Sequence, residues 1–157
     1  CASGVIDLAM GGPGFSGFDV QKKVDIDFLP KYSYGPKDYR RMIYMTRIRQ
    51  EVEPVFGLFD CPDATQVMGL RGRTTTSLQA FNLSNSGFVV QQSKLMADRL
   101  ERTTTGNRQA AALAYRLAFG REAVPEELDQ AAVFVEQEGM WMFCRALFNA
   151  NEFLTVP

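Results

Sequence analysis

The chain has 157 residues, of which 46% are apolar and 22% are charged, the usual balance of a globular domain rather than of a disordered chain. With 17 basic and 18 acidic residues, the net charge of −1 argues against electrostatic binding of nucleic acid. No apolar run reaches the roughly 20 residues that cross a bilayer. We therefore expect one domain over residues 1–157, with no nucleic-acid partner and no transmembrane segment.

Histidine is absent from the sequence. Its absence excludes a Ser-His-Asp triad, a Cys-His dyad and a C-x-x-C-H haem attachment within this chain. The cysteines Cys1, Cys61 and Cys144 lie too far apart in sequence for a C-x-x-C zinc or redox motif. We predict no catalytic residue, no metal site and no cofactor in this chain. Cys61 and Cys144 can form a disulfide in an oxidising compartment, or both can be buried as free thiols.

The N-terminal part of the chain predicts an irregular loop and a small β pair. Residues 10–18, MGGPGFSGF, are rich in glycine, which is typical of a turn with positive φ or of a backbone that approaches a ligand. Apolar residues alternate from Val20 to Phe28, the period of a half-buried strand. We expect its antiparallel partner in Arg41–Arg49, where a helix is the alternative.

The segment of residues 52–69, VEPVFGLFDCPDATQVMG, predicts a helical turn followed by an ordered loop. Asp60 and Asp63 bracket Cys61 and Pro62 at a spacing that suits hydrogen bonds to nearby backbone N–H groups. The oxygen ligands of a calcium loop are missing. As an acidic pair, Asp60 and Asp63 are also candidates for the acid and base of glycoside hydrolysis.

The next segment, residues 71–89, has the sequence RGRTTTSLQAFNLSNSGFV. Arg71 and Arg73 are candidates for an anion site, because a guanidinium binds a carboxylate or sulfate in bidentate fashion. The spacing G-x-x-x-x-G-K of a phosphate-binding loop is absent. The competing interpretation, which we favour, is structural: Thr76 and Gln79 match a capping box, in which each satisfies the other's backbone N–H. The segment then predicts a short helix, a turn and a longer helix.

The remainder of the chain predicts helices. Three apolar stripes recur at helical spacing: Val89, Ser93, Met96, Ala97 and Leu100; Ala110, Leu113, Ala114 and Leu117; and Leu128, Ala131, Ala132 and Val135. Gly120 suits a left-handed helix end, and Pro125 suits the first turn of the next helix. Residues 139–154 are apolar nearly all round and predict a central helix. The expected fold is mainly α, a bundle-like helical domain with a small antiparallel β pair near the N-terminus.

Five motifs occur in an order that resembles a known family: GGPGF, RRMIYMTRIRQEVEPVFGLFDCPDA, RTTTSLQAFNLSNSGFVVQQSKLMADRL, YRLAFGREAVPEEL and FCRALFNANEFLTVP. From about Gly4 to Pro157 the chain resembles the C-terminal domain, of unknown function, of planctomycete-type surface cytochrome proteins. The resemblance implies that the chain is the latter portion of that domain, at the end of a larger multidomain chain. The resemblance implies an extracytoplasmic location, at the cell surface or in the periplasm, and haem in the upstream parent sequence. It supplies no catalytic residues.

Two functions follow as hypotheses. The first is a non-catalytic structural and interaction module that packs on upstream domains of the same parent chain or builds a surface assembly. The 12 phenylalanines favour it, because they indicate a large interior or a large apolar interface. The alternative is a carbohydrate- or anion-binding domain of a polymer-degrading or redox enzyme, with a polysaccharide as ligand.

Overall fold

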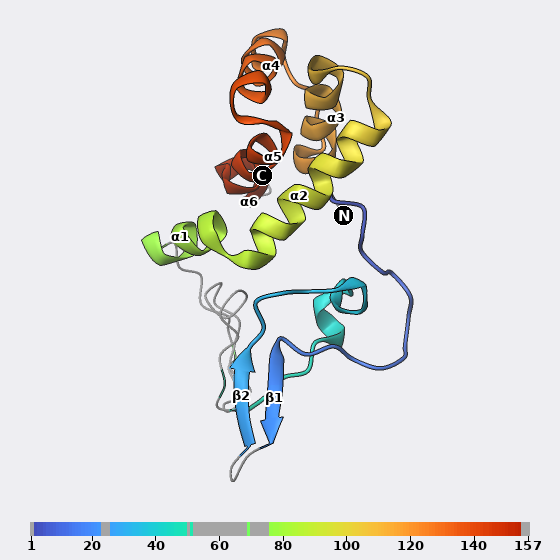
Figure 1. The fold of residues 1–157 in the computed structure, drawn as a ribbon, viewed down its shortest axis with the longest axis vertical. Helices are drawn as coiled ribbons and strands as arrows, with labels where there is room; N and C mark the ends of the chain where they lie inside the picture. The colour runs from blue at the N-terminus through green and yellow to red at the C-terminus, as the bar shows by residue number, and fades with distance from the viewer. Residues whose placement is uncertain (1, 23–25, 50, 52–68, 70–75, 155–157) are drawn as a thin grey trace. The chain divides into compact units, whose positions relative to one another are not determined.

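The computed structural model describes residues 2–22, 26–49, 51, 69 and 76–154. The predicted mainly α fold, with an antiparallel β pair near the N-terminus, is confirmed (Figure 1). Two compact units make up the chain. Unit 1 comprises Cys1–Val5, Leu83–Asn85 and Val89–Pro157, and unit 2 comprises Ile6–Asn82 and Ser86–Phe88. That residues 1–157 act as one domain at the end of a longer chain stays a prediction.

The β pair of unit 2 differs from the predicted one. Strands β1 (Phe18–Lys22) and β2 (Ile26–Pro30) pair with each other, so that Val20 lies opposite Phe28. The prediction of a single strand over Val20–Phe28 was therefore wrong. An alternating pattern has the same period in one long strand and in the two arms of a hairpin, and only the pairing distinguishes them.

The predicted partner strand at Arg41–Arg49 is also absent. A short 3-10 helix, η2 (Met42–Tyr44), lies there instead, and a second one, η1 (Pro36–Asp38), precedes it. Isolated bridges nevertheless tie this part of the chain to the N-terminal loop, between Asp7 and Arg40 and between Phe15 and Met45. Tyr44 and Met45 thus contact the N-terminal loop and do not form a strand ladder.

The glycine-rich loop of unit 2 packs against its own chain. Gly11 and Gly12 have φ values of +75° and +82°, which other residues rarely adopt. A Cβ atom on Gly14 would lie 2.6 Å from the carbonyl oxygen of Tyr44, so this position has no room for a side chain. The close approach that Gly14 allows is therefore to Tyr44.

Arg40 holds this loop in place. Its guanidinium donates hydrogen bonds to the backbone carbonyls of Ala9, Gly11 and Pro13 at 3.1, 2.6 and 2.5 Å. It also stacks over the Tyr44 ring, with 4.0 Å between the guanidinium carbon and the ring centroid. The Tyr44 hydroxyl in turn accepts a hydrogen bond from the Gly11 N–H at 2.9 Å. One side chain thereby fixes a loop that has little apolar core of its own.

The other described elements are helices, which run in order from green to red in Figure 1. They are α1 (Ser77–Asn85), α2 (Gly87–Thr103), α3 (Asn107–Phe119), α4 (Pro125–Glu138), α5 (Met140–Asn149) and α6 (Asn151–Leu154). Within unit 1, α4 packs against α3 and α5, and α6 packs against α5 and α3. Among these described residues, no helix is long and apolar enough to span a bilayer.

The predicted stripe of α2 is confirmed. Its buried residues are Val89, Ser93, Met96, Ala97 and Leu100. In α3 the buried residues include Ala110 and Ala114, as expected, and in α4 they are Ala131 and Val135. The predicted leucines of these two stripes, Leu113, Leu117 and Leu128, are half-buried. The 3.6-residue period thus identified the inward faces, and the depth of each residue depended on the neighbouring helices.

The predicted last helix is interrupted. Ala150 is extended and separates α5 from the short α6. Near this break the Asn149 side chain donates a hydrogen bond to the Arg145 carbonyl at 2.7 Å, a local side-chain bond that competes with regular helix bonding. The Arg145 guanidinium is itself satisfied by the Ser84 carbonyl, with the Arg145 Nε atom at 2.8 Å.

Helix α5 contributes most to the described core of unit 1. Its buried residues are Met140, Phe143, Cys144, Leu147 and Phe148. The sequence left two states open for Cys144, a disulfide with Cys61 or a buried free thiol. The structure has Cys144 as a buried free thiol. Burial raises the pKa of the Cys144 thiol to about 12. This cysteine is therefore a small apolar core residue rather than a reactive one.

Candidate functional site

Four of the sequence-predicted site residues lie outside the described residues. They are the carboxylate pair Asp60 and Asp63 and the arginines Arg71 and Arg73. The hypotheses of a carbohydrate-active carboxylate pair and of an anion site stay predictions.

The residues predicted as helix caps lie at helix ends. The Thr76 N–H donates to Gln79 Oε1 at 3.0 Å, and the Gln79 N–H donates to Thr76 Oγ1 at 3.3 Å, directly before α1. Gly120 follows α3 with a φ of +73°, and its N–H bonds to the Arg116 carbonyl at 3.1 Å. Pro125 is the first residue of α4. These residues shape the helix ends, and none of them lines either of the two hollows described below.

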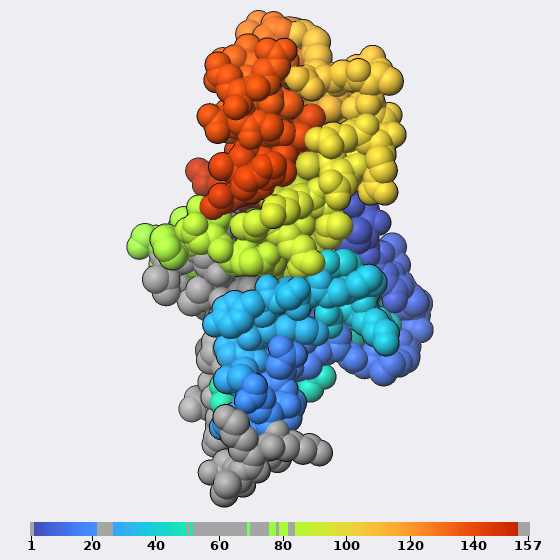
Figure 2. Space-filling model, viewed as in Figure 1, coloured from blue at the N-terminus to red at the C-terminus, as the bar shows by residue number. Residues whose placement is uncertain are grey.

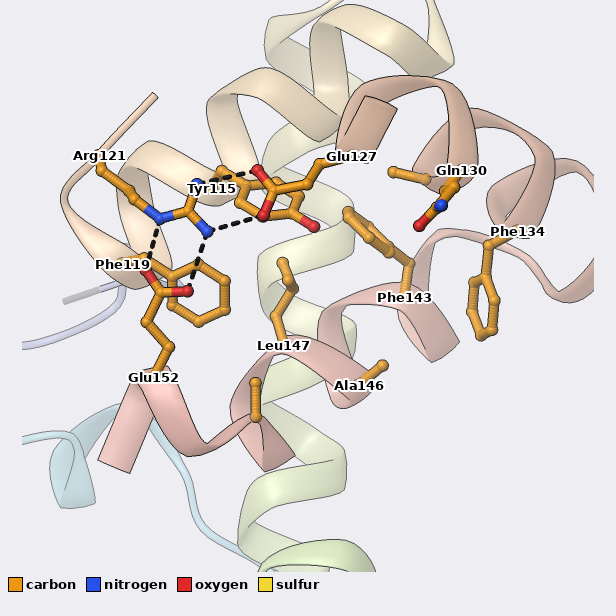
Figure 3. Close-up of a pocket in the computed structure, with 12 residues that line it drawn as sticks. Tyr115, Phe119, Arg121, Glu127, Gln130, Phe134, Phe143, Ala146, Leu147 and Glu152 are labelled. Atoms are coloured by element: carbon orange, nitrogen blue, oxygen red, sulfur yellow. Dashed lines mark hydrogen bonds and ion pairs between the residues drawn. The ribbon is translucent and has the colours of Figure 1, made fainter. Parts of the chain in front are cut away.

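The hollow that does stand out lies in unit 1, among α3, α4, α5 and α6 (Figure 3). Its volume is about 350 Å³. Most of its lining side chains are apolar: Tyr115, Phe119, Ala131, Phe134, Phe143, Ala146, Leu147 and Ala150. The polar ones are Arg121, Glu127, Gln130 and Glu152. We call this the aromatic pocket.

A charged trio forms one side of the aromatic pocket. The Arg121 guanidinium binds Glu127 in bidentate fashion, with both N–O distances at 2.8 Å. The same guanidinium reaches Glu152 on its other side, with Nε at 2.5 Å and Nη2 at 2.9 Å from the two carboxylate oxygens. Figure 3 shows Arg121 between the two carboxylates. Because Glu127 belongs to α4 and Glu152 to α6, the arginine joins the two helices across the pocket edge.

Arg121 pairs with both carboxylates of the trio. Hydrogen bonds from Arg121, together with one from the Val124 backbone N–H, lower the pKa of Glu127 to about 2. The hydrogen bond from Arg121 likewise lowers the pKa of Glu152. Both carboxylates are therefore ionised at neutral pH, and neither can donate a proton. A glycoside hydrolase needs one of its two carboxyl groups protonated, so this pair does not meet that requirement.

No metal site accompanies the pocket. In the part of the chain that the structure describes, no three His, Cys, Asp or Glu side chains gather closely enough to hold an ion. Tyr115 interacts electrostatically with all three members of the trio, and its pKa is raised, mainly by burial. The Arg121 guanidinium lies 5.4 Å from the Tyr115 ring centroid, which adds a cation–π contact to the two ion pairs.

A family model matches residues 1–135 of the chain, and its description reads PSD1, protein of unknown function (DUF1553). The chain belongs to this family. The DUF1553 match agrees with the expected domain of unknown function, and most of the aromatic pocket, from Tyr115 to Phe134, lies within it. The residues of α5 and α6 that complete the pocket follow the matched region. Searches among curated proteins and among solved structures gave no significant match.

Sequence reasoning missed the charged trio. It placed Pro125 in the first turn of a helix, and the position of Glu127, three residues after Val124, was a usable signal for a carboxylate that binds the first backbone N–H. No signal pointed to Glu152, which lies 31 residues from Arg121. That contact exists because the chain turns at Ala150 and α6 packs against α3 and α5.

Proposed function

We propose that this DUF1553 chain is a non-catalytic structural and interaction module at the C-terminal end of an exported, haem-associated bacterial surface protein. The observation that carries this proposal is the aromatic pocket of unit 1, a solvent-open hollow of about 350 Å³ with an apolar lining. Hollows of this kind accept the apolar side chains of a partner and exclude water around them.

The chemistry of the pocket supports contact rather than catalysis. The guanidinium and both carboxylates of the charged trio are occupied by one another. The only described thiol, Cys144, is protonated at neutral pH because burial raises its pKa to about 12. No described side chain in the pocket is therefore prepared to act as a nucleophile or a general base.

The partner in this proposal is the upstream part of the same parent protein, in an extracytoplasmic setting. This assignment rests on the resemblance to the end domain of surface cytochrome proteins, and it places haem upstream, outside this histidine-free chain. The alternative of polysaccharide or anion binding depends on Asp60, Asp63, Arg71 and Arg73, which lie outside the described residues.

The test is binding between this chain and the upstream region of its parent, produced separately and measured by calorimetry. Ala146 lines the pocket and is exposed on α5, so Ala146→Phe fills the pocket without disturbing the core. We expect about tenfold weaker binding, the loss of one well-packed apolar contact. The matched control is Ala80→Phe, at an exposed position of α1 outside the pocket.

Two results would contradict the proposal. One is the absence of binding between the wild-type chain and the upstream region. The other is equal weakening by Ala146→Phe and Ala80→Phe, because the pocket would then have no special part in the contact. The visible spectrum of the upstream region tests the haem association separately, since a bound haem gives a Soret band.

A further inference from the structure

The outer face of α4 carries exposed apolar side chains. Val133 is 53% exposed and Phe134 is 38% exposed. With Asp129, Gln130 and Gln137 they line a second hollow of about 430 Å³. In the space-filling view, α4 belongs to the orange outer surface of unit 1 (Figure 2). We use the name α4 face for Gln130, Val133, Phe134 and Gln137.

The second hollow adjoins the aromatic pocket. Gln130 and Phe134 line both of them. In Figure 3 these two side chains project from α4, with Phe134 beside Phe143 of the pocket. The Phe134 ring centroid lies 6.3 Å from that of Phe143, so the ring is held on one side and exposed on the other. An apolar surface thus extends from the pocket over Phe134 and along α4.

Carboxylates border this surface on both sides. Helix α4, PEELDQAAVFVEQE, contains acidic residues and no lysine or arginine. With roughly 3.6 residues per turn, Asp129 and Glu136 are two turns apart and lie along one edge of the α4 face. Glu127 and Glu138 are three turns apart and lie along the other edge. The α4 face, with apolar Val133 and Phe134 between Gln130 and Gln137, therefore lies between two acidic edges.

The acidic edges retain charge that is not neutralised by the described part of the chain. Glu127 is bound by Arg121, and Asp129 forms an ion pair with Arg108. Glu136 and Glu138 are exposed, and no ion pair among the described residues includes them. A partner that covers the α4 face must also lie against these carboxylates. Acidic partner residues would be repelled there, and basic ones attracted.

We infer that the α4 face docks a basic amphipathic helix of a partner polypeptide. This inference rests on the proposed function, and it adds the chemistry of the segment that is bound. Apolar side chains of the partner helix, spaced three and four residues apart, enter the hollows on either side of Phe134. Lysine or arginine side chains flanking them lie along the acidic edges. The exposed ring of Phe134 is the central anchor of the contact.

The test uses two synthetic helical peptides with the same leucine spacing, one with lysine and one with glutamate at the remaining positions. Binding to the full chain is followed by fluorescence anisotropy. We expect the Leu/Lys peptide to bind, with weaker binding as salt rises, and the Leu/Glu peptide not to bind. The double variant Glu136→Gln/Glu138→Gln should weaken Leu/Lys binding about tenfold.

The matched control removes the same charge from another helix of unit 1. Asp98 and Glu101 are exposed on α2, and Asp98→Asn/Glu101→Gln should leave Leu/Lys binding within about twofold of the wild type. Phe134→Ser tests the apolar anchor, with circular dichroism to verify that the helices remain. The inference is overturned if both peptides bind alike, if neither binds, or if the α4 and α2 double variants bind the Leu/Lys peptide equally.

The same variants separate this inference from the proposed function. Suppose the upstream region of the parent binds and Ala146→Phe weakens it, but the Leu/Lys peptide does not bind. The interaction role then stands, and the basic helix on α4 is wrong. If instead the Leu/Lys peptide binds in an α4-dependent way and the upstream region does not bind, the α4 inference stands and the proposed partner is wrong.

Discussion

The contacts inside unit 1 differ in kind from the contacts inside unit 2. In unit 1 most of the innermost side chains are apolar, with Met96, Leu100 and Cys144 at 0% exposure. In unit 2 the N-terminal loop depends on Arg40, whose guanidinium bonds to three backbone carbonyls 27 to 31 residues away. The buried face of a helix can thus be predicted from the periodicity of its own sequence. The distant arginine that fixes a loop cannot be predicted from the sequence of that loop.

The two units also use arginine differently. Arg40 has a side chain only 8% exposed and bonds mainly to carbonyl groups of the backbone. Arg121, at 38% exposure, bonds mainly to carboxylates at the edge of a pocket. Exposed ion pairs contribute little to stability, because solvent screens them. Arg40 should therefore matter for folding, and Arg121 mainly for the shape and charge of the pocket edge.

The largest effect should come from the core of unit 1. Leu100→Ala removes a side chain with 0% exposure, and we expect a loss of about 2–5 kcal/mol in the free energy of unfolding. Urea denaturation measures it, and hydrogen exchange should quicken first in α2, α3 and α5. Glu101→Ala, at the exposed neighbouring position, is the control. A loss below about 1 kcal/mol would contradict the assignment of Leu100 to a packed core.

The second-largest loss of stability should come from a change in unit 2. Arg40→Ala removes the bonds to Ala9, Gly11 and Pro13, and we expect a loss of about 2 kcal/mol. Arg40→Lys should not restore it, because an ammonium lacks the planar fork that reaches several acceptors. Hydrogen exchange of residues 9–15 is the readout. Arg41→Ala is the control, since Arg41 contacts the same Tyr44 ring only at 5.7 Å. Equal hydrogen exchange of residues 9–15 in Arg40→Ala and Arg41→Ala would contradict the special role of Arg40.

A smaller effect should come from the start of α1. Thr76→Ala breaks the reciprocal hydrogen bonds with Gln79 and should cost about 1 kcal/mol. Thr76→Ser keeps the hydroxyl and should cost much less. Thermal unfolding monitored by circular dichroism compares the two variants. An unchanged melting temperature in Thr76→Ala would show that α1 does not need this cap.

The smallest effect should be on how the stability of unit 1 changes at acidic pH. The pKa of Glu127 is about 2 in the folded chain, below its usual value of 4.5. A lowered pKa stabilises the folded state above the usual value, and this stabilisation is lost as the pH falls from about 4.5 toward 2. Glu127→Gln should therefore show a shallower decline of the urea midpoint over that range than the wild type. Glu126→Gln, at the exposed neighbouring position, should keep the wild-type slope, and a shallower slope there too would contradict the assignment.

Much of the helical architecture could be predicted from local sequence. The stripe of α2 from Val89 to Leu100 matches the buried set because every third or fourth residue of a helix faces the same way. The β pair was predicted in kind, but its two strands were placed wrongly. The alternation around Val20 and Phe28 has the same period in one strand and in a hairpin, so the sequence pattern could not choose between them.

The sequence by itself determined the helical class, the inward face of α2 and the absence of histidine chemistry, because these depend on residue type and on contacts within a turn or two. Only the tertiary structure decided which arginine holds the N-terminal loop and which carboxylates meet Arg121. It also decided that α4 leaves Val133 and Phe134 exposed beside a pocket. Contacts of this second kind join residues far apart in the chain, and they form only where packed helices and loops bring those residues together.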